Sequence, residues 1–368
     1  MRGRLPQDDD APIGQRTEAG PRPSFAMQMP KRGKRVTGLN RDAVARRHEE
    51  ARSGFSTALE RPVKLPTPFA TLLLWLMFLV GASPAAATSL TTSAATQYVE
   101  LDGARIAYRT IGPQGGVPLL LLNRFRGTMD DWDPALIDRI ARERQVLMFD
   151  QPGFARSSGK PPDSLPAFAS SAARLARTLG HRQVDVLGFS MGGTVALQFA
   201  LDHPELLRRL VVAGSGPGHV PDVPPGPPAS DRVWPVATKA VNDDADFLFL
   251  FFENTPSSQA AGQAYRDRLR QRSDAFSRLV EPAAWQAQLR SAQSVGTPAT
   301  SLLPKLGTIT QPTLVANGRE DIMVPTYASF AMARAIPRGR LLIYPDSGHG
   351  FLFQYPEDFA DEVLRFLR

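Results

Sequence analysis

The sequence contains no cysteine, and this absence excludes three kinds of chemistry. Disulfide bonds, thiolate metal sites and a cysteine nucleophile all require a thiol. Histidine is scarce as well, with five residues in a chain of 368. Any imidazole base must therefore be one of five side chains.

The positive charge of the chain is concentrated at its start. The formal net charge is +7, and residues 1–64 carry 14 of the 43 Lys and Arg but only 8 of the 36 Asp and Glu. This segment accounts for +6, so the rest of the chain is nearly neutral. A neutral body lacks the basic surface that binds nucleic acid, and we expect no nucleic-acid partner.

Residues 1–62 are rich in Arg, Pro, Gly and acidic residues and have no sustained apolar period. Such a composition is typical of segments that cannot build a core. We expect this leader to be disordered, or not to be translated at all. In the second case the true start is Val63, encoded by an alternative start codon.

Residues 63–87 have the three parts of a secretory signal peptide. A positive flank at Lys64 precedes an apolar core, 69–82, and an Ala-x-Ala ending at Ala87. Cleavage there predicts a secreted or periplasmic protein. The alternative is an uncleaved membrane anchor, for which the apolar core is short, and only then do we expect a membrane partner.

From Gln97 onward the chain alternates between strand and helix patterns. Asp102-Gly103 joins two alternating runs and predicts a β-hairpin. Six continuous apolar runs follow, as in parallel strands buried on both faces. They are 118–123, 145–150, 184–189, 209–214, 312–317 and 340–345. Helical patterns between several of these runs predict one α/β domain, 97–368, with a doubly wound, mostly parallel sheet.

The interval between two of these runs is too long for a simple crossover. Residues 215–308 begin with a proline-rich stretch and continue with helical patterns. Because this interval lies between two predicted strands, we expect a helical cap inserted into the α/β domain.

A serine occupies a tight corner in Gly188-Phe189-Ser190-Met191-Gly192. The pattern G-x-S-x-G, with a strand before it and a helix after it, is typical of a nucleophile that projects from a sheet. Small flanking residues let neighbouring backbone pass close by. The helix that begins at Met191 directs its free N–H groups at charge developing on the substrate. Ser190 is therefore the predicted nucleophile.

A serine nucleophile needs a base, and the base needs an acid that holds its tautomer. His349 lies in a glycine-flanked loop after the last strand, whereas the other histidines lie in the leader, in two surface turns and in the proline-rich stretch. Asp321 follows the preceding strand, with Glu320 beside it as the alternative acid. An aspartate in such a loop is, taken alone, more often a turn or cap residue. The order Ser190, Asp321, His349 on three loops after strands favours catalysis.

Four motifs together resemble the α/β-hydrolase superfamily, in particular its capped bacterial serine hydrolases of the esterase and cofactor-free haloperoxidase-like branch. They are DQPGFARS at 150–157, GFSMGG at 188–193, NGREDIMVP at 317–325 and SGHG at 347–350. The resemblance extends from about Tyr98 to Arg368. It implies Ser190 as nucleophile, Asp321 as acid and His349 as base.

One loop departs from the pattern of this family. The family usually has His-Gly and an apolar residue after the third strand, where a backbone N–H completes the oxyanion hole. This chain has Asn123-Arg124-Phe125-Arg126-Gly127. By position, the backbone N–H groups of Phe125 and of Met191, the residue after the nucleophile, together form the oxyanion hole.

The same loop supplies candidate substrate-binding residues. Arg124 or Arg126 either meets an acidic substrate group or is a solvated surface arginine. Asn123 and Trp132 are further candidates, and for Trp132 the alternative is core packing near the loop.

These features predict a serine hydrolase that cleaves small, largely apolar carboxylic esters through an acyl-enzyme, without metal or organic cofactor. Similar hydrolases let hydrogen peroxide attack the acyl-enzyme, as perhydrolases and haloperoxidases do, and others cleave carbon-carbon bonds. A third hypothesis is a ligand-binding protein that kept the fold and lost turnover. The altered loop 123–127 is the feature that favours it, and the three catalytic residues argue against it.

Overall fold

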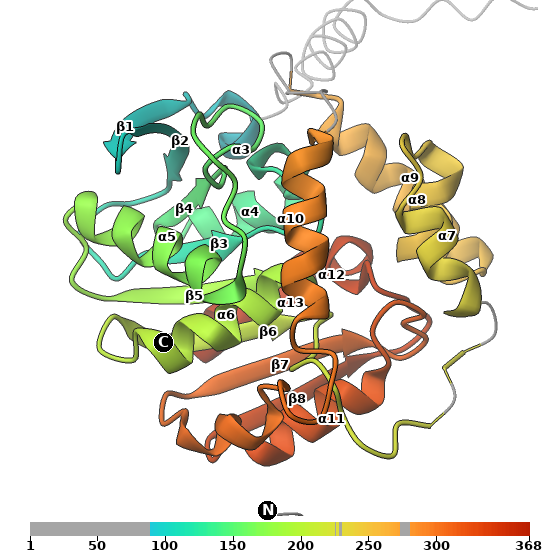
Figure 1. Ribbon diagram of the computed structural model, residues 1–368. Helices are drawn as coiled ribbons and strands as arrows, with labels where there is room; N and C mark the ends of the chain where they lie inside the picture. Colours follow the sequence, from blue (N-terminus) through green and yellow to red (C-terminus); the bar gives the residue numbers. More distant parts are fainter. Residues whose placement is uncertain (1–88, 225, 228–229, 273–279) are drawn as a thin grey trace, which may run out of the picture. The chain divides into compact units, whose positions relative to one another are not determined.

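The computed structural model describes residues 89–224, 226–227, 230–272 and 280–368, which form an eight-stranded sheet with helices on both faces (Figure 1). The strand order is β1-β2-β4-β3-β5-β6-β7-β8. β2 runs antiparallel to β1 and to β4, and the other neighbouring strands run parallel, so the predicted mostly parallel sheet is confirmed. The strands are β1 (Gln97–Leu101), β2 (Ala104–Ile111), β3 (Leu119–Leu122), β4 (Val146–Phe149), β5 (Val184–Phe189), β6 (Leu207–Ala213), β7 (Thr313–Gly318) and β8 (Gly339–Tyr344).

The central strands consist of residues that are buried on both faces of the sheet. Every residue of β3, β4 and β5 is buried, which explains why their sequences are almost entirely apolar. The hairpin strands β1 and β2 lie at one edge; β1 is mostly exposed, and β2 has buried positions interrupted by less buried ones. Hydrophobic burial in the middle of the sheet therefore holds the ends of β3 and β5 in place.

Helices cover both faces of this sheet, as the doubly wound pattern predicts. The helices α5, α6 and α11 contribute to one core cluster, and α4 and α13 contribute to the other. The helical segments outside the β6–β7 interval are α3 (Leu90–Ser93), η1 (Met129–Asp131), α4 (Pro134–Ala141), α5 (Leu165–Thr178), α6 (Met191–Asp202), α11 (Thr326–Ala335), α12 (Phe351–Gln354) and α13 (Pro356–Leu367).

A helical insertion lies between β6 and β7, coloured yellow to orange in Figure 1. Its described segments are η2 (Ser230–Arg232), α7 (Val233–Ala237), α8 (Asp244–Phe251), α9 (Pro256–Leu269), α10 (Pro282–Gln293) and η3 (Leu303–Thr308). The tyrosine hydroxyl of Tyr265 in α9 donates to the carbonyl of Asp131 at 2.7 Å, and the side chain is fully buried. The insertion is thus packed directly against the loop that follows β3.

The predicted leader, 1–62, and the predicted signal peptide or anchor, 63–87, lie outside the described residues. Among the residues that are described, no helix has the length and the apolar character needed to cross a membrane.

Candidate active site

Ser190 lies at a sharp corner between β5 and α6. Its φ is 56° and its ψ is −125°, a left-handed backbone that is strained for any residue with a Cβ. The N–H of Ser190 donates to the carbonyl of Ala213 in the neighbouring strand at 2.9 Å, which anchors the corner to the sheet. The side chain is 8 % exposed, so it meets a small cavity rather than open solvent.

Two glycines make this corner possible because backbone passes through the space that a Cβ would fill. A Cβ on Gly188 would lie 2.1 Å from the carbonyl oxygen of Gly192. A Cβ on Gly192 would lie 2.1 Å from the carbonyl oxygen of Leu122, at the end of β3. The glycines of the motif therefore let α6 begin directly against β5 and β3.

We expect Gly192→Ala to destabilise the fold by about 1–3 kcal/mol, because its methyl group forces the start of α6 away from β3. Urea denaturation measures this loss. Gly116→Ala is the matched control, since a Cβ at Gly116 meets no atom within 4 Å. Equal stability of the two variants would contradict the close packing of α6 on β3.

His349 follows β8 and faces Asp321, which follows β7. The Nδ1–H of His349 donates to Oδ2 of Asp321 at 2.8 Å, and both side chains are fully buried. The imidazole packs against the rings of Phe189 and Phe251, with centroids 5.0 Å and 5.3 Å away. Among the described residues its Nε2 has no hydrogen-bond partner, so this nitrogen is left to accept a proton.

The carboxylate of Asp321 is held by its own loop. Its Oδ1 accepts the backbone N–H groups of Met323 at 2.7 Å and Val324 at 2.9 Å. Glu320, the alternative acid, forms an ion pair with Arg319 at 2.9 Å instead. The geometry therefore brings together Asp321 and His349, and it leaves Glu320 on a different partner.

A short turn after β3 lies beside Ser190. The N–H of Gly127 donates to the carbonyl of Arg124 at 3.0 Å and closes the turn. In the described part of the chain, the backbone N–H groups of Phe125 and Met191 donate no hydrogen bond. Phe125 and Ser190 line the same cavity, which has a volume of about 50 Å³. Two backbone donors are thus available near the serine hydroxyl.

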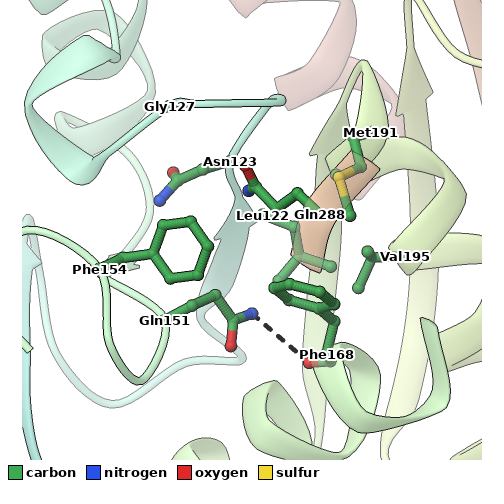
Figure 2. Close-up of a pocket in the computed structure, with 10 residues that line it drawn as sticks. Leu122, Asn123, Gly127, Gln151, Phe154, Phe168, Met191, Val195 and Gln288 are labelled. Carbon is green, nitrogen blue, oxygen red and sulfur yellow. Dashed lines mark hydrogen bonds between the residues drawn. The ribbon is translucent and has the colours of Figure 1, made fainter. Parts of the chain in front are cut away.

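Asn123, the residue before this turn, is fixed by hydrogen bonds to Phe149 and Trp132. Asn123 donates from Nδ2 to the carbonyl of Phe149 at 3.0 Å and accepts the indole N–H of Trp132 at 2.7 Å. Trp132 is buried and packs against Phe189. Each polar atom of the two side chains has a partner within the protein. Figure 2 shows Asn123 in a small pocket that is also lined by Gln288.

The two arginines of the turn are engaged within the protein. Arg124 forms an ion pair with Asp131 at 2.8 Å, and its guanidinium lies 5.2 Å from the ring centroid of Phe251. Arg126 extends to the helical insertion and donates to the carbonyl of Lys239 at 2.7 Å. Burial lowers the pKa of Arg126, and the nearby charge of Arg124 lowers it further.

Asp150 of the DQPGFARS motif has a role that sequence reasoning did not assign. Its buried carboxylate accepts the N–H of Met129 at 2.8 Å, next to the turn after β3. Burial raises the pKa of Asp150 to about 7, and the hydrogen bonds from the N–H groups of Met129 and Arg156 oppose this shift. The motif therefore ties the end of β4 to the loop beside the candidate site. The motif itself is the signal that could have indicated this role.

The chain is similar in sequence to known hydrolases. A family model described as "alpha/beta hydrolase fold" matches residues 117–356. Poly(3-hydroxyalkanoate) depolymerase of Ectopseudomonas oleovorans is 30% identical over 279 residues, covering 73% of this chain and 91% of that protein. Pimeloyl-[acyl-carrier protein] methyl ester esterase of Nitrosomonas europaea is 28% identical and covers 67% and 93%.

A solved structure also resembles this chain closely. An alpha/beta hydrolase fold protein from Chitinophaga pinensis superimposes with a TM-score of 0.68 at 33% identity, covering 75% of this chain and 98% of that one.

Proposed function

The chain belongs to the alpha/beta hydrolase family, and from this premise we propose that it cleaves small, largely apolar carboxylic esters through an acyl-enzyme on Ser190. Nε2 of His349 takes the proton of the Ser190 hydroxyl as its oxygen attacks the ester carbonyl, and then gives that proton to the departing alcohol. Asp321 holds the imidazole by its Nδ1–H. Water, activated by the same histidine, attacks the acyl-enzyme, releases the acid and restores the serine.

The backbone donors beside Ser190 complete this proposal. The N–H groups of Phe125 and Met191 bind the oxygen that becomes negative in the tetrahedral intermediate. Met191 is the first residue of α6, so the positive end of the helix dipole adds to this stabilisation.

The observation that carries the proposal is the hydrogen bond between His349 and Asp321 on two loops next to the Ser190 corner. The imidazole packs on Phe189, the residue immediately before Ser190, and on Phe251, which lines the same cavity as Ser190. A buried imidazole whose Nδ1 is held by a carboxylate can act as the base of a serine nucleophile through Nε2. Among the described residues the Nε2 of His349 has no other partner, so it is available to the Ser190 hydroxyl.

The cavity beside Ser190 supports a small, apolar acyl or alcohol group. Its volume is about 50 Å³, and Leu250, Phe251 and Met323 contribute apolar walls. The arginines that also line it already bind groups of the protein. An uncharged ester therefore fits better than an acidic one.

A panel of p-nitrophenyl esters, from acetate to octanoate, tests this proposal on the purified protein. We expect turnover that is fastest with short acyl chains, together with covalent labelling of Ser190 by a fluorophosphonate probe. Added hydrogen peroxide distinguishes hydrolysis from peracid formation. A folded protein that neither cleaves an ester nor reacts with the probe would contradict the proposal and favour the binding-protein hypothesis.

A further inference from the structure

The turn at 124–127 has an unusual residue at its third position. Arg126 has a φ of 56°, where a β-turn favours glycine or asparagine. A left-handed backbone at a long, charged residue is strained, and such strain persists only where the surrounding structure maintains it. The contacts of Arg126 therefore indicate what holds the turn.

The side chain of Arg126 binds the last residue of α7 and the segment that follows it in the helical insertion. Its Nη1 donates to the carbonyl oxygens of Ala237 at 3.3 Å and Lys239 at 2.7 Å, and to Oδ1 of Asn242 at 3.2 Å. Its Nη2 donates to the carbonyl oxygen of Ala240 at 3.0 Å. The carbonyl of Ala237 ends α7 without a helical partner, and the carbonyls that follow it also point at the guanidinium, so this segment is a suitable receptor for a cation.

The backbone of the turn is bound by a second part of the insertion. The N–H of Arg126 donates to Oε1 of Gln288 in α10 at 2.8 Å, and Gln288 is buried. Figure 2 shows this glutamine in the pocket that Met191 also lines. The ring of Phe125 meets the ring of Trp285, also in α10, edge-on at 6.3 Å. Arg126 is thus held through its side chain by α7 and through its backbone by α10.

The closed turn determines where the N–H of Phe125 points. The carbonyl of Arg124 and the N–H of Phe125 belong to one planar trans peptide group, so they point in opposite directions. Because the N–H of Gly127 holds that carbonyl inside the turn, the N–H of Phe125 points out of it. Opening the turn would rotate this peptide group and move the donor.

We propose that Arg126 and Gln288 are positioning residues that aim the N–H of Phe125 at the oxyanion, so that the oxyanion hole is complete only while the helical insertion is docked on the core. This inference rests on the proposed ester hydrolysis. The alternative role of Arg126, binding an acidic substrate group, competes with the four acceptors that its guanidinium already has.

The variant Arg126→Gly tests the inference because glycine adopts the left-handed turn without strain and removes only the contacts to the insertion. We expect kcat to fall about 10- to 100-fold while KM changes by less than about 2-fold, since the donor acts in the transition state. An alkylboronic acid, which forms a tetrahedral adduct with the serine, should bind more weakly by a similar factor. Added guanidinium ion should restore part of kcat.

Arg266→Ala is the matched control within the insertion. Arg266 pairs with Asp244 and lies over the ring of Phe247, and among the described residues it has no hydrogen bond or ion pair with the turn. We expect its kcat to stay within about 2-fold of the wild type, because surface ion pairs contribute little. Gln288→Met removes the acceptor of the Arg126 N–H and should also lower kcat. If Arg126→Gly does not fold, the kcat of Gln288→Met compared with that of Arg266→Ala tests the same inference.

Two results would overturn the assignment of Arg126. One is an unchanged kcat in folded Arg126→Gly. The other is a loss confined to KM for esters with an acidic group, which would make Arg126 a substrate ligand. If the wild type cleaves no ester and Ser190 is not labelled, the proposed function and this assignment fail together. An active wild type with an unaffected Arg126→Gly variant removes the assignment alone.

Discussion

A Ser190→Ala variant is expected to lose ester turnover by about 10⁵-fold, because no other atom in the proposed mechanism can form the acyl-enzyme. The alanine removes one oxygen from a side chain that lines a cavity of about 50 Å³, so little packing is lost. Steady-state hydrolysis of the best ester of the panel measures the loss. Labelling by the fluorophosphonate probe should disappear at the same time.

The buried Ser215 offers a matched control for this substitution. It follows β6, and its hydroxyl lies 3.3 Å from the hydroxyl of Thr194 in α6. Ser215→Ala should keep kcat within a few-fold of the wild type, since its hydroxyl takes no part in the proposed reaction. If Ser190→Ala retained turnover while remaining folded, the nucleophile would have to be sought elsewhere.

The sheet and the corner could be predicted because they depend on local sequence. Strands buried on both faces are mostly apolar, so β3 and β4 are visible as uninterrupted runs, and β5 as a run broken only by Asp185, which pairs with Arg144 and Arg208. The corner at Ser190 needs small residues where backbone passes, and those glycines lie within four residues of one another. In both cases the physical constraint acts on neighbouring positions of the chain.

The support of the turn after β3 could not be predicted, because it depends on distant segments. The hydrogen bonds of Arg126 join it to acceptors more than 110 residues away, and Gln288 is 162 residues away. Nothing near Arg126 in the sequence distinguishes a solvated arginine from one that binds the end of α7. Gln288 lies in a helix whose sequence has no local sign of its role.

An Asp321→Asn variant is expected to lower kcat by about 10³- to 10⁴-fold, as replacement of the triad acid does in other serine hydrolases. The amide group cannot accept a hydrogen bond with its nitrogen, so it favours the tautomer of His349 that carries its proton on Nε2. That tautomer cannot take the proton of Ser190. The loss should appear in the chemical steps, measured as the rate of acylation under single turnover with enzyme in excess.

The neighbouring Glu320 makes this prediction specific. Glu320→Gln is the same chemical change one residue earlier, on a side chain that is paired with Arg319 rather than with His349. We expect its kcat to remain within about 2-fold of the wild type, because an exposed ion pair contributes little. A large loss in Glu320→Gln, with Asp321→Asn nearly active, would assign the acid to Glu320. The 2.8 Å bond between Asp321 and His349 argues for the opposite outcome, since it holds the base in the tautomer that catalysis needs.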